Sequence, residues 1–307
     1  MEVYLVKEKI LELLKQSNEY HSGEELSQRF GVTRAAVWKS IKQLEALGYV
    51  IESKTRKGYR LVGTPDILFE SELTDLLHSK FLSYSIHHLT NTSSTNDFAK
   101  QLAEQNQPEG HVVISEYQTK GRGKKHSQWE AAPGKGIYLS VVLRPEIGVM
   151  QLPKLTICVQ TAVCLALEQV TQEKIQCQWP YSLYCHGKKL CGILLESFGS
   201  IEQLDYTIAG IGIQVNADED ELPDGMTSLL LVTQREQDRK QLAAAVLNHL
   251  DIIYHQFCQG QFGSVFQQYW HHYSFQSMPE GDWEYAGIAE DYTLQAVEQN
   301  TGKTICL

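Results

Sequence analysis

The stretch from Gln118 to Trp129, Gln-Thr-Lys-Gly-Arg-Gly-Lys-Lys-His-Ser-Gln-Trp, combines two glycines with a cluster of cations. It follows the apolar run His111 to Tyr117, whose pattern predicts a buried strand, so we expect a loop that leaves the edge of a sheet. Gly121 and Gly123 can adopt positive φ and let backbone N–H groups approach a ligand. The cations that could bind phosphate or carboxylate are Lys120, Arg122, Lys124 and Lys125. The stretch therefore predicts an anion cradle, with a solvated basic loop as the alternative.

The length and composition of the chain indicate a soluble globular protein. Its 307 residues, 42% of them hydrophobic, can bury a large core divided among two or three domains. We find no run of about 18 apolar residues, the length that a membrane-spanning helix needs. The N-terminus also lacks a basic segment followed by an apolar leader. We therefore expect a cytoplasmic protein without a membrane partner.

Charge is distributed unevenly along the chain. The formal net charge is −10, but residues 1–63 carry 11 Lys and Arg against 8 Asp and Glu, a net charge of +3. The remaining residues therefore carry a net charge of −13. A small basic domain joined to a larger acidic one predicts that any contact with nucleic acid belongs to the N-terminal part.

The seven cysteines form no C-x-x-C pair and are odd in number. Most of them lie within apolar segments. This pattern favours buried free thiols over disulfides or a metal site.

The first 63 residues have the pattern of a winged helix-turn-helix. Amphipathic helices are predicted over 3–15, from Ser22 to Phe30 and from Thr33 onward, with Gly31 in the turn and Ser22 and Thr33 as N-caps. A basic hairpin follows over 49–61. We expect DNA contacts from Thr33, Arg34, Trp38, Lys39, Lys42, Arg56 and Lys57. The alternative is a three-helix interaction module whose cations are only solvated.

Beyond residue 63 the pattern predicts an α+β fold in which strands alternate with helices. The hydroxyl-rich turn 91–96 could cap a helix from Asn96 to Gln105 or bind a polar ligand. Helices are also expected over 70–81, 152–170, 237–258 and 262–273. Strands are expected over 136–143 and 204–215, in a hairpin of 175–184 with 189–197, and as two or three short strands within 283–307.

At this point the motifs resemble those of the bifunctional biotin protein ligase and biotin operon repressor family, over nearly the whole chain. The loop motif and the Lys-x-x-Gly-Ile-Leu strand are specific together. The segments that carry the resemblance follow the winged helix in this order: Ser94-Thr95-Asn96, Glu116 to Gly123, Trp129, Tyr138-Leu139-Ser140, Trp179-Pro180, Lys188 to Leu194 and Gly210-Ile211-Gly212-Ile213.

The resemblance implies both a fold and a function. The fold would comprise a winged helix-turn-helix over 1–63, a mixed sheet of the class II aminoacyl-tRNA synthetase-like type over 64–275, and a short SH3-like β domain over 276–307. The family converts biotin and ATP, with Mg²⁺, to biotinyl-5′-AMP and transfers the biotin to a lysine of a biotin carboxyl carrier protein. The adenylate-loaded form dimerises on operator DNA and represses biotin genes.

The resemblance also assigns roles to residues, because cations and N–H groups must offset the repulsion between a carboxylate and an α-phosphate. Arg122 and Lys189 would be catalytic. The biotin-binding set would be Ser94, Thr95, Asn96, Gln118, Gly121, Arg122, Gly123, Lys124, Lys189 and Gly192. Lys124, Lys125 and Trp129 would contact the adenylate and its phosphate.

Several positions depart from the family pattern, mostly on the nucleotide side. The Lys-Trp-Pro-Asn-Asp motif is here Gln178-Trp179-Pro180-Tyr181-Ser182, so a cation, an amide and a carboxylate are missing, which puts the Mg²⁺ site in doubt. Gln214 replaces an asparagine, and Ser93 an acidic residue. The absence of one charge-assisted hydrogen bond costs about 1.5–3 kcal/mol, enough in combination to slow adenylation greatly. Two hypotheses therefore stand, a ligase with repressor function and a biotin-sensing regulator with impaired catalysis. A lipoate or other acyl ligase fits the fold but leaves the winged helix unexplained.

Overall fold

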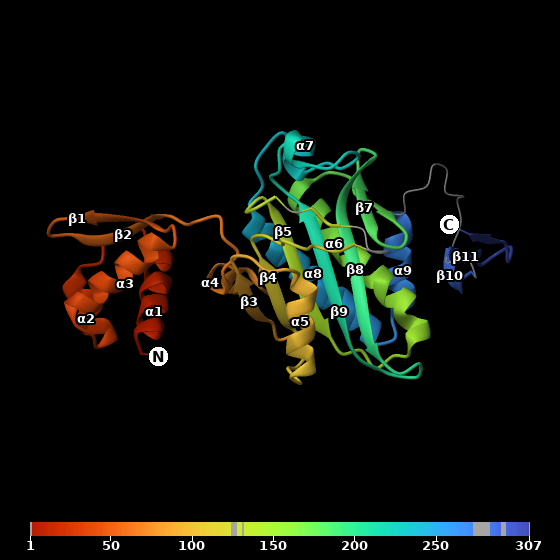
Figure 1. Ribbon diagram of the computed structural model, residues 1–307, viewed down its shortest axis with the longest axis horizontal. Coiled ribbons are helices and arrows are strands. Elements are labelled where there is room, and N and C mark those ends of the chain that lie inside the picture. Colours follow the sequence, from red (N-terminus) through yellow and green to blue (C-terminus); the bar gives the residue numbers. More distant parts are fainter. Residues whose placement is uncertain (1, 124–127, 131, 273–282, 290–292, 307) are drawn as a thin grey trace. The chain divides into compact units, whose positions relative to one another are not determined.

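The computed structural model describes residues 2–123, 128–130, 132–272, 283–289 and 293–306. The chain forms two units, Met1–Asp66 and Ile67–Leu307, and each is described by itself (Figure 1). The predicted boundary after residue 63 and a separate domain after 275 stay predictions.

The first unit is a winged helix, as predicted. Its helices are α1 (Glu2–Gln16), α2 (Gly23–Phe30) and α3 (Arg34–Ala46), followed by the strands β1 (Val50–Lys54) and β2 (Gly58–Gly63). Ser22 and Glu25 form the predicted capping box at the start of α2. Gly31 ends that helix with φ 66°, and the Thr33 hydroxyl accepts a hydrogen bond from the Ala36 N–H at 3.2 Å. Apolar side chains from all three helices, among them Ile10, Leu26 and Val37, fill one small core.

The second unit is built on a seven-stranded mixed sheet. Its strand order is β3-β4-β5-β9-β8-β7-β6, in which only the β3 and β4 pair is parallel. The strands are β3 (Ser85–Leu89), β4 (His111–Ser115), β5 (Gly136–Leu143), β6 (Gln176–Gln178), β7 (Ser182–Cys185), β8 (Lys188–Gly199) and β9 (Leu204–Gln214). Its helices are α4 (Glu70–Leu73), α5 (Thr95–Glu104), α6 (Leu152–Thr171), α7 (Leu229–Thr233), α8 (Arg239–Cys258) and α9 (Phe262–His271), with 3₁₀ turns at Thr74–Leu76, Val149–Gln151 and Glu219–Glu221.

Helices cover both faces of this sheet (Figure 1). Side chains alternate along β5, so Ile137, Leu139 and Val141 join the large core under α6 and α8, whereas Val142 joins a smaller core under α5. Helix α5 covers only part of its face. The start of α5 and parts of β8 and β9 line a cavity on this face.

The predicted helix over 70–81 is wrong beyond its first turns. Only α4 and one 3₁₀ turn form, ending at Leu76. The N–H groups of Lys80, Phe81 and Leu82 donate instead to the carboxylate of Asp251 on α8, at 2.9, 3.0 and 2.5 Å. A buried carboxylate that gathers several N–H groups competes directly with the helical hydrogen-bond ladder.

The predicted strand over 175–184 is broken into β6 and β7. These two strands pair with each other antiparallel, so the chain reverses direction between Gln178 and Ser182, where Pro180 has no N–H to donate. The buried side chain of Gln160 on α6 spans the gap, donating to the carbonyl groups of Gln178 and Ser182 at 3.1 and 3.3 Å. The predicted hairpin with the following strand is confirmed, because β7 pairs with β8.

The segment Val149–Thr171 is long and apolar enough to cross a membrane, with a mean hydropathy of 1.4, contrary to the expectation from the sequence. However, 61% of the most apolar 18-residue window in this segment is buried inside the protein, where α6 packs against α8 and the sheet. This is the pattern of a core helix. Five of the cysteines, including Cys158 and Cys164 on α6, are buried free thiols as predicted, while Cys258 and Cys306 are exposed.

The C-terminal segment forms a three-stranded antiparallel sheet of β10 (Trp283–Ile288), β11 (Leu294–Glu298) and β12 (Thr304–Cys306), as predicted. Trp283 stacks on Trp270 of α9 with ring centroids 5.5 Å apart. Its carbonyl group also accepts a hydrogen bond from the Gln267 amide at 2.6 Å.

A buried ion pair holds the start of the loop stretch. Arg239, at the beginning of α8, is only 1% exposed, and its Nη1 lies 2.8 Å from Oε2 of Glu116 and 3.0 Å from the Gly136 carbonyl oxygen. Burial tends to raise the pKa of Glu116, but hydrogen bonding to His88 and the charge of Arg239 lower it overall. The pair therefore joins α8 to the ends of β4 and β5.

We expect Arg239→Met to lower the free energy of unfolding by about 3–5 kcal/mol, because it leaves the Glu116 carboxylate buried without its cation. Urea unfolding followed by circular dichroism measures the loss. Arg235→Met, at an exposed position nearby, serves as the control and should stay within about 0.5 kcal/mol of the wild type. Equal stability of the two variants would contradict the role given to the pair.

Candidate functional site

Glycines on two adjacent strands, β8 and β9, form a floor without side chains on the open face of the sheet, and β5 borders this floor. The register pairs Gly192 on β8 with Gly212 on β9, and Gly212 with Tyr138 on β5. In the next row, Gly210 pairs with Ser140. Because side chains alternate between faces, these residues all lie on the same face. Glycines on adjacent strands therefore leave the backbone bare over a continuous area.

The indole of Trp129 lies on this floor. A Cβ atom at Gly192 would come within 2.7 Å of the ring, and one at Gly212 within 2.6 Å. Trp129 is 8% exposed, and its Nε1–H finds no acceptor among the described residues. At Gly121 the glycine is needed for close approach and not for positive φ, because a Cβ atom would lie 2.5 Å from the Trp129 carbonyl oxygen.

One side of the cavity is a hydrogen-bonded group of small polar residues. The Ser140 hydroxyl oxygen lies 2.7 Å from Thr95 Oγ1 and 2.6 Å from Asn96 Oδ1, and its single proton is shared between these two acceptors. Gln118 Oε1 accepts from the N–H and the hydroxyl of Thr95 at 2.8 and 3.1 Å. Ser94 is buried at the N-cap of α5, but its side chain makes no capping hydrogen bond. This leaves the Ser94 hydroxyl available to a ligand.

Arg122 is held above this group by two carboxylates. Its guanidinium makes a bidentate ion pair with Asp97, at 2.7 and 2.8 Å, and reaches Glu196 at 3.3 Å. The hydrogen bonds to Asp97 raise the pKa of Arg122, so it stays cationic. The Asn96 amide donates to the same Glu196 carboxylate at 2.7 Å. Arg122 therefore spans from the loop to α5 and β8.

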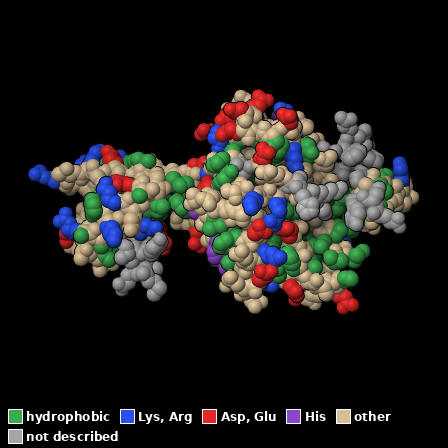
Figure 2. Space-filling model, viewed as in Figure 1, with side chains coloured by type: hydrophobic (Ala, Val, Ile, Leu, Met, Phe, Trp, Pro, Cys, Tyr) green, Lys and Arg blue, Asp and Glu red, His purple; other side chains and the backbone are tan. Residues whose placement is uncertain are grey.

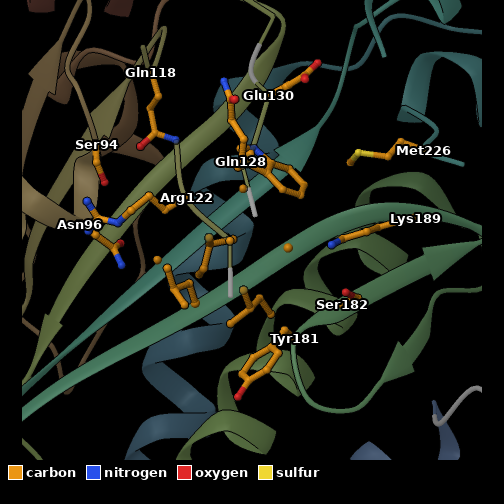
Figure 3. Close-up of a pocket in the computed structure, with 18 of the residues that line it drawn as sticks. Ser94, Asn96, Gln118, Arg122, Gln128, Glu130, Tyr181, Ser182, Lys189 and Met226 are labelled. Atoms are coloured by element: carbon orange, nitrogen blue, oxygen red, sulfur yellow. The ribbon is translucent and has the colours of Figure 1, made fainter. Parts of the chain in front are cut away.

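Lys189 stands on the opposite side (Figure 3). Its Nζ lies 5.5 Å from the centroid of the Trp129 ring. Its backbone is fixed by hydrogen bonds to Gly225 and Thr227, at 3.0 and 2.9 Å. Tyr181 and Ser182 lie near Lys189 on this side, whereas Gln118 and Asn96 lie across the cavity in Figure 3.

These two sides enclose a cavity of about 460 Å³, a size suited to a small-molecule ligand. The predicted site residues that line it are Ser94, Thr95, Asn96, Gln118, Arg122, Gly123, Trp129, Lys189 and Gly192. Gly121 does not line it, but its carbonyl oxygen accepts a hydrogen bond from the Trp129 N–H at 2.9 Å. Lys124 and Lys125 lie outside the described residues. Lining residues that the sequence analysis did not assign to the site include Gln128, Glu130, Ile193, Leu194, Asp224 and Met226.

The signals that could have revealed these additional residues were weak. Glu130 directly follows Trp129, and Ile193 and Leu194 are part of the motif that carries the resemblance. Asp224 and Met226 come from a loop without any motif, and only the backbone pairing with Lys189 brings them to the cavity.

The predicted DNA-binding residues are all exposed on the first unit. Trp38 is 56% exposed on α3, and Arg34 has only a 3.7 Å ion pair with Glu24. In the face shown in Figure 2, Lys and Arg side chains are spread over this unit. Arg56 lies in the turn of the wing with φ 67°. The exposed set is Thr33, Arg34, Trp38, Lys39, Lys42, Arg56 and Lys57.

Comparison with known proteins supports both the N-terminal helix-turn-helix unit and the ligase fold of the second unit. An HTH domain matches residues 6–60, and the biotin/lipoate A/B protein ligase family matches residues 89–214. The bifunctional ligase/repressor BirA of Bacillus subtilis is 34% identical over 246 residues, which cover 80% of this chain and 76% of that protein. The chain belongs to the family of bifunctional biotin protein ligases and biotin operon repressors. BirA of Escherichia coli is 28% identical over 79% of this chain and 74% of its own length.

Solved structures of the family share the fold. The biotin protein ligase from Aquifex aeolicus, in complex with biotin and ATP, has a TM-score of 0.54 and 25% sequence identity. The match covers 73% of this chain and 98% of that one. The family therefore accounts for the central fold, and the HTH domain accounts for the N-terminal unit.

The departures from the family pattern do not all reach the cavity. Tyr181 and Ser182 line it, but Gln178 is exposed on β6 and does not. Gln214 is 1% exposed and donates to the Glu130 carbonyl group at 2.9 Å. It therefore fixes the chain just beyond Trp129. Ser93, also exposed, accepts a hydrogen bond from Lys120 N–H through its carbonyl oxygen at 2.9 Å.

We expect Gly212→Ala to weaken biotin binding by about tenfold or more, because the added methyl group enters the space above the floor and overpacking costs about 1–3 kcal/mol. Calorimetric titration with biotin measures the change. Gly263→Ala on α9, where a Cβ atom meets nothing within 4 Å, is the matched control and should bind normally. Unchanged affinity in the Gly212 variant would show that the floor is not part of the ligand site.

Proposed function

We propose that this chain is a biotin protein ligase that also represses transcription in response to biotin. The observation that carries the proposal is the single cavity side on which Ser94, Thr95, Asn96 and Gln118 meet, facing Lys189 across a glycine floor. A neutral polar side suits the ureido group of biotin. A cationic side suits its carboxylate and the α-phosphate of ATP.

Each side has a distinct part in the reaction. The polar side orients biotin and excludes water from its head group. Lys189 and Arg122 offset the charge when the biotin carboxylate attacks the α-phosphate, and pyrophosphate leaves. Trp129 covers the adenylate, and a lysine amine of the carrier then attacks the activated carbonyl and releases AMP. Lys124 and Lys125 would contribute further charge toward phosphate.

A Mg²⁺ ion that enters with ATP is part of the same proposal, although Ser182 supplies no charge. Mg²⁺ is commonly held by one or two carboxylates together with substrate phosphates. Glu130 and Asp224 are the carboxylates that line the cavity. When bound, Mg²⁺ would neutralise phosphate charge during adenylation.

The partners of the proposed function follow from the two units. The second unit would act on a biotin carboxyl carrier protein domain, and the first would bind operator DNA. We propose that the loaded chain is a homodimer, since two recognition helices can then read two half-sites. A cytoplasmic location, where both partners would be found, is part of the same proposal.

A second candidate is a biotin-sensing regulator with little ligase activity. Tyr181 and Ser182 favour it, because both stand on the cationic side where the family has an amide and a carboxylate. Biotin binding would survive these changes, since the polar side across the cavity keeps the family residues. Turnover in the presence of Mg-ATP and a carrier domain separates the two candidates.

We expect the full-length chain to biotinylate a carrier domain, and Lys189→Ala to lower the rate by about 10²-fold or more by removing a charge that faces the transition state. The measurement is carrier biotinylation followed by mass spectrometry, with biotin affinity determined in parallel. Lys188→Ala is the control, because Lys188 is exposed and pairs only loosely with Glu219 at 4.0 Å. If the wild-type protein binds biotin but does not biotinylate the carrier domain, the proposal of a biotin-sensing regulator replaces that of a ligase.

We expect Arg34→Ala and Lys39→Ala to weaken operator binding and to reduce the slope of its salt dependence by about 0.9 for each phosphate that the variant no longer neutralises. Biotin affinity should not change, because both residues belong to the first unit. Gel shifts at several salt concentrations test this. Lys9→Ala on α1, also exposed, is the control. Unchanged gel shifts for the α3 variants would remove α3 from the DNA interface.

A further inference from the structure

A second group of potential ligands lies away from the cavity, where α6, the end of α9 and the chain entering β6 meet. Cys164 and Glu168 are four residues apart on α6, so both side chains project from one face of the helix. His272 follows α9. The Cys164 sulfur, a Glu168 carboxylate oxygen and a His272 ring nitrogen all lie within 4.8 Å of one another.

One ring nitrogen of His272 is hydrogen-bonded to a backbone carbonyl group, and the other faces the carboxylate of Glu168. Nδ1 lies 2.7 Å from the carbonyl oxygen of Gln268, a contact that only an N–H can satisfy. Nε2 of the neutral ring therefore carries a lone pair, and it lies 3.0 Å from Oε2 of Glu168. Two acceptors face each other, so a second proton or a cation must lie between them. A histidine whose Nδ1–H is bound by a carbonyl group is also the usual form of a metal ligand.

The remaining contacts orient the other two ligands toward the same point. Oε1 of Glu168 accepts the Ile175 N–H at 3.0 Å, which leaves Oε2 for the shared space. The Cys164 sulfur is buried beside the Ile175 carbonyl group, at 3.6 Å. The N–H of Cys177 donates to the His272 carbonyl group at 2.6 Å and so ties the α9 end to β6. An ion pair between His272 and Glu168 would not need the Cys164 thiol beside it, whereas a metal ion would use all three side chains.

We propose that Cys164, Glu168 and His272 bind a structural Zn²⁺ ion. Thiolate, imidazole and carboxylate together form a donor set typical of zinc. Ligand distances of about 2.0–2.3 Å need only a modest contraction of the present group. Water takes the fourth position. On binding, the Cys164 thiol releases its proton to the buffer and the sulfur–zinc bond forms.

Such an ion would stabilise the wall of the cavity from behind. It would fix the chain that enters β6, and β6 leads directly into the turn carrying Tyr181 and Ser182. It would also fix the end of α9. The site is therefore separate from ligand binding in the cavity but mechanically connected to it.

The sequence offers no signal for this site, because its residues have no C-x-x-C or His-x-x-x-His spacing. They become neighbours only when α9 packs against α6. The sequence-based preference for free thiols would then hold for Cys158 but not for Cys164.

The test uses the full chain with both exposed thiols removed, Cys258→Ser and Cys306→Ser, treated with a chelator and then titrated with Zn²⁺. We expect one ion per chain and a rise in melting temperature of several degrees. Co²⁺ in place of Zn²⁺ should give the visible absorption of a tetrahedral site and a sulfur-to-metal charge-transfer band. Absence of metal binding at micromolar concentrations would overturn the proposal.

Matched variants locate the site. His272→Gln should weaken Zn²⁺ binding by about tenfold or more, while His271→Gln, its exposed neighbour, should bind as before. Cys164→Ser should remove the charge-transfer band, and Cys158→Ser, equally buried on α6, should keep it. His272 is partly exposed, so its variant should fold. Equal Zn²⁺ affinity of the His271 and His272 variants would sink the proposal.

Discussion

The cavity depends on the contact between Trp129 and the bare backbone of β8 and β9. At Gly192 and Gly212 any side chain would occupy the space of the indole, as the distances of 2.7 and 2.6 Å show. The sheet register is what brings these two glycines together, since they are direct partners across the strands. A flat aromatic ring against a flat floor can be replaced by another flat group of similar size. The same surface therefore suits both the resting tryptophan and a ligand.

The charges around this floor are organised by the fold as well as by the loop. Arg122 is exposed but is paired with Asp97 and Glu196, and the loop itself begins next to the buried pair of Glu116 and Arg239. Buried and partly buried charges need such partners, because desolvation alone would cost several kcal/mol. The acidic unit thus supplies the carboxylate partners of Arg122.

The sequence predicted most of the fold, because periodicity and capping are local properties. Ser22, Thr33 and Gly31 end or begin helices as expected, and the site motifs converge because strand alternation places them on one face. The failures are non-local. The helix over 70–81 is lost to the carboxylate of Asp251, which lies far away in sequence. The carboxylate partners of Arg122 could not be assigned either, since loop conformation decides which acids it meets.

The ion pairs of Arg122 bear on how a ligand could act as a signal. A ligand shifts a conformational equilibrium only by the difference in its affinity for the two states. If Arg122 turns to phosphate, the ligand must exceed two carboxylate contacts, and Asp97 and Glu196 are then left to seek other partners. Free biotin offers one anionic carboxylate, and the adenylate offers one anionic phosphate in its place, because the carboxyl group is consumed in the mixed anhydride. Either ligand would therefore need contacts beyond this one charge to draw Arg122 away from Asp97 and Glu196.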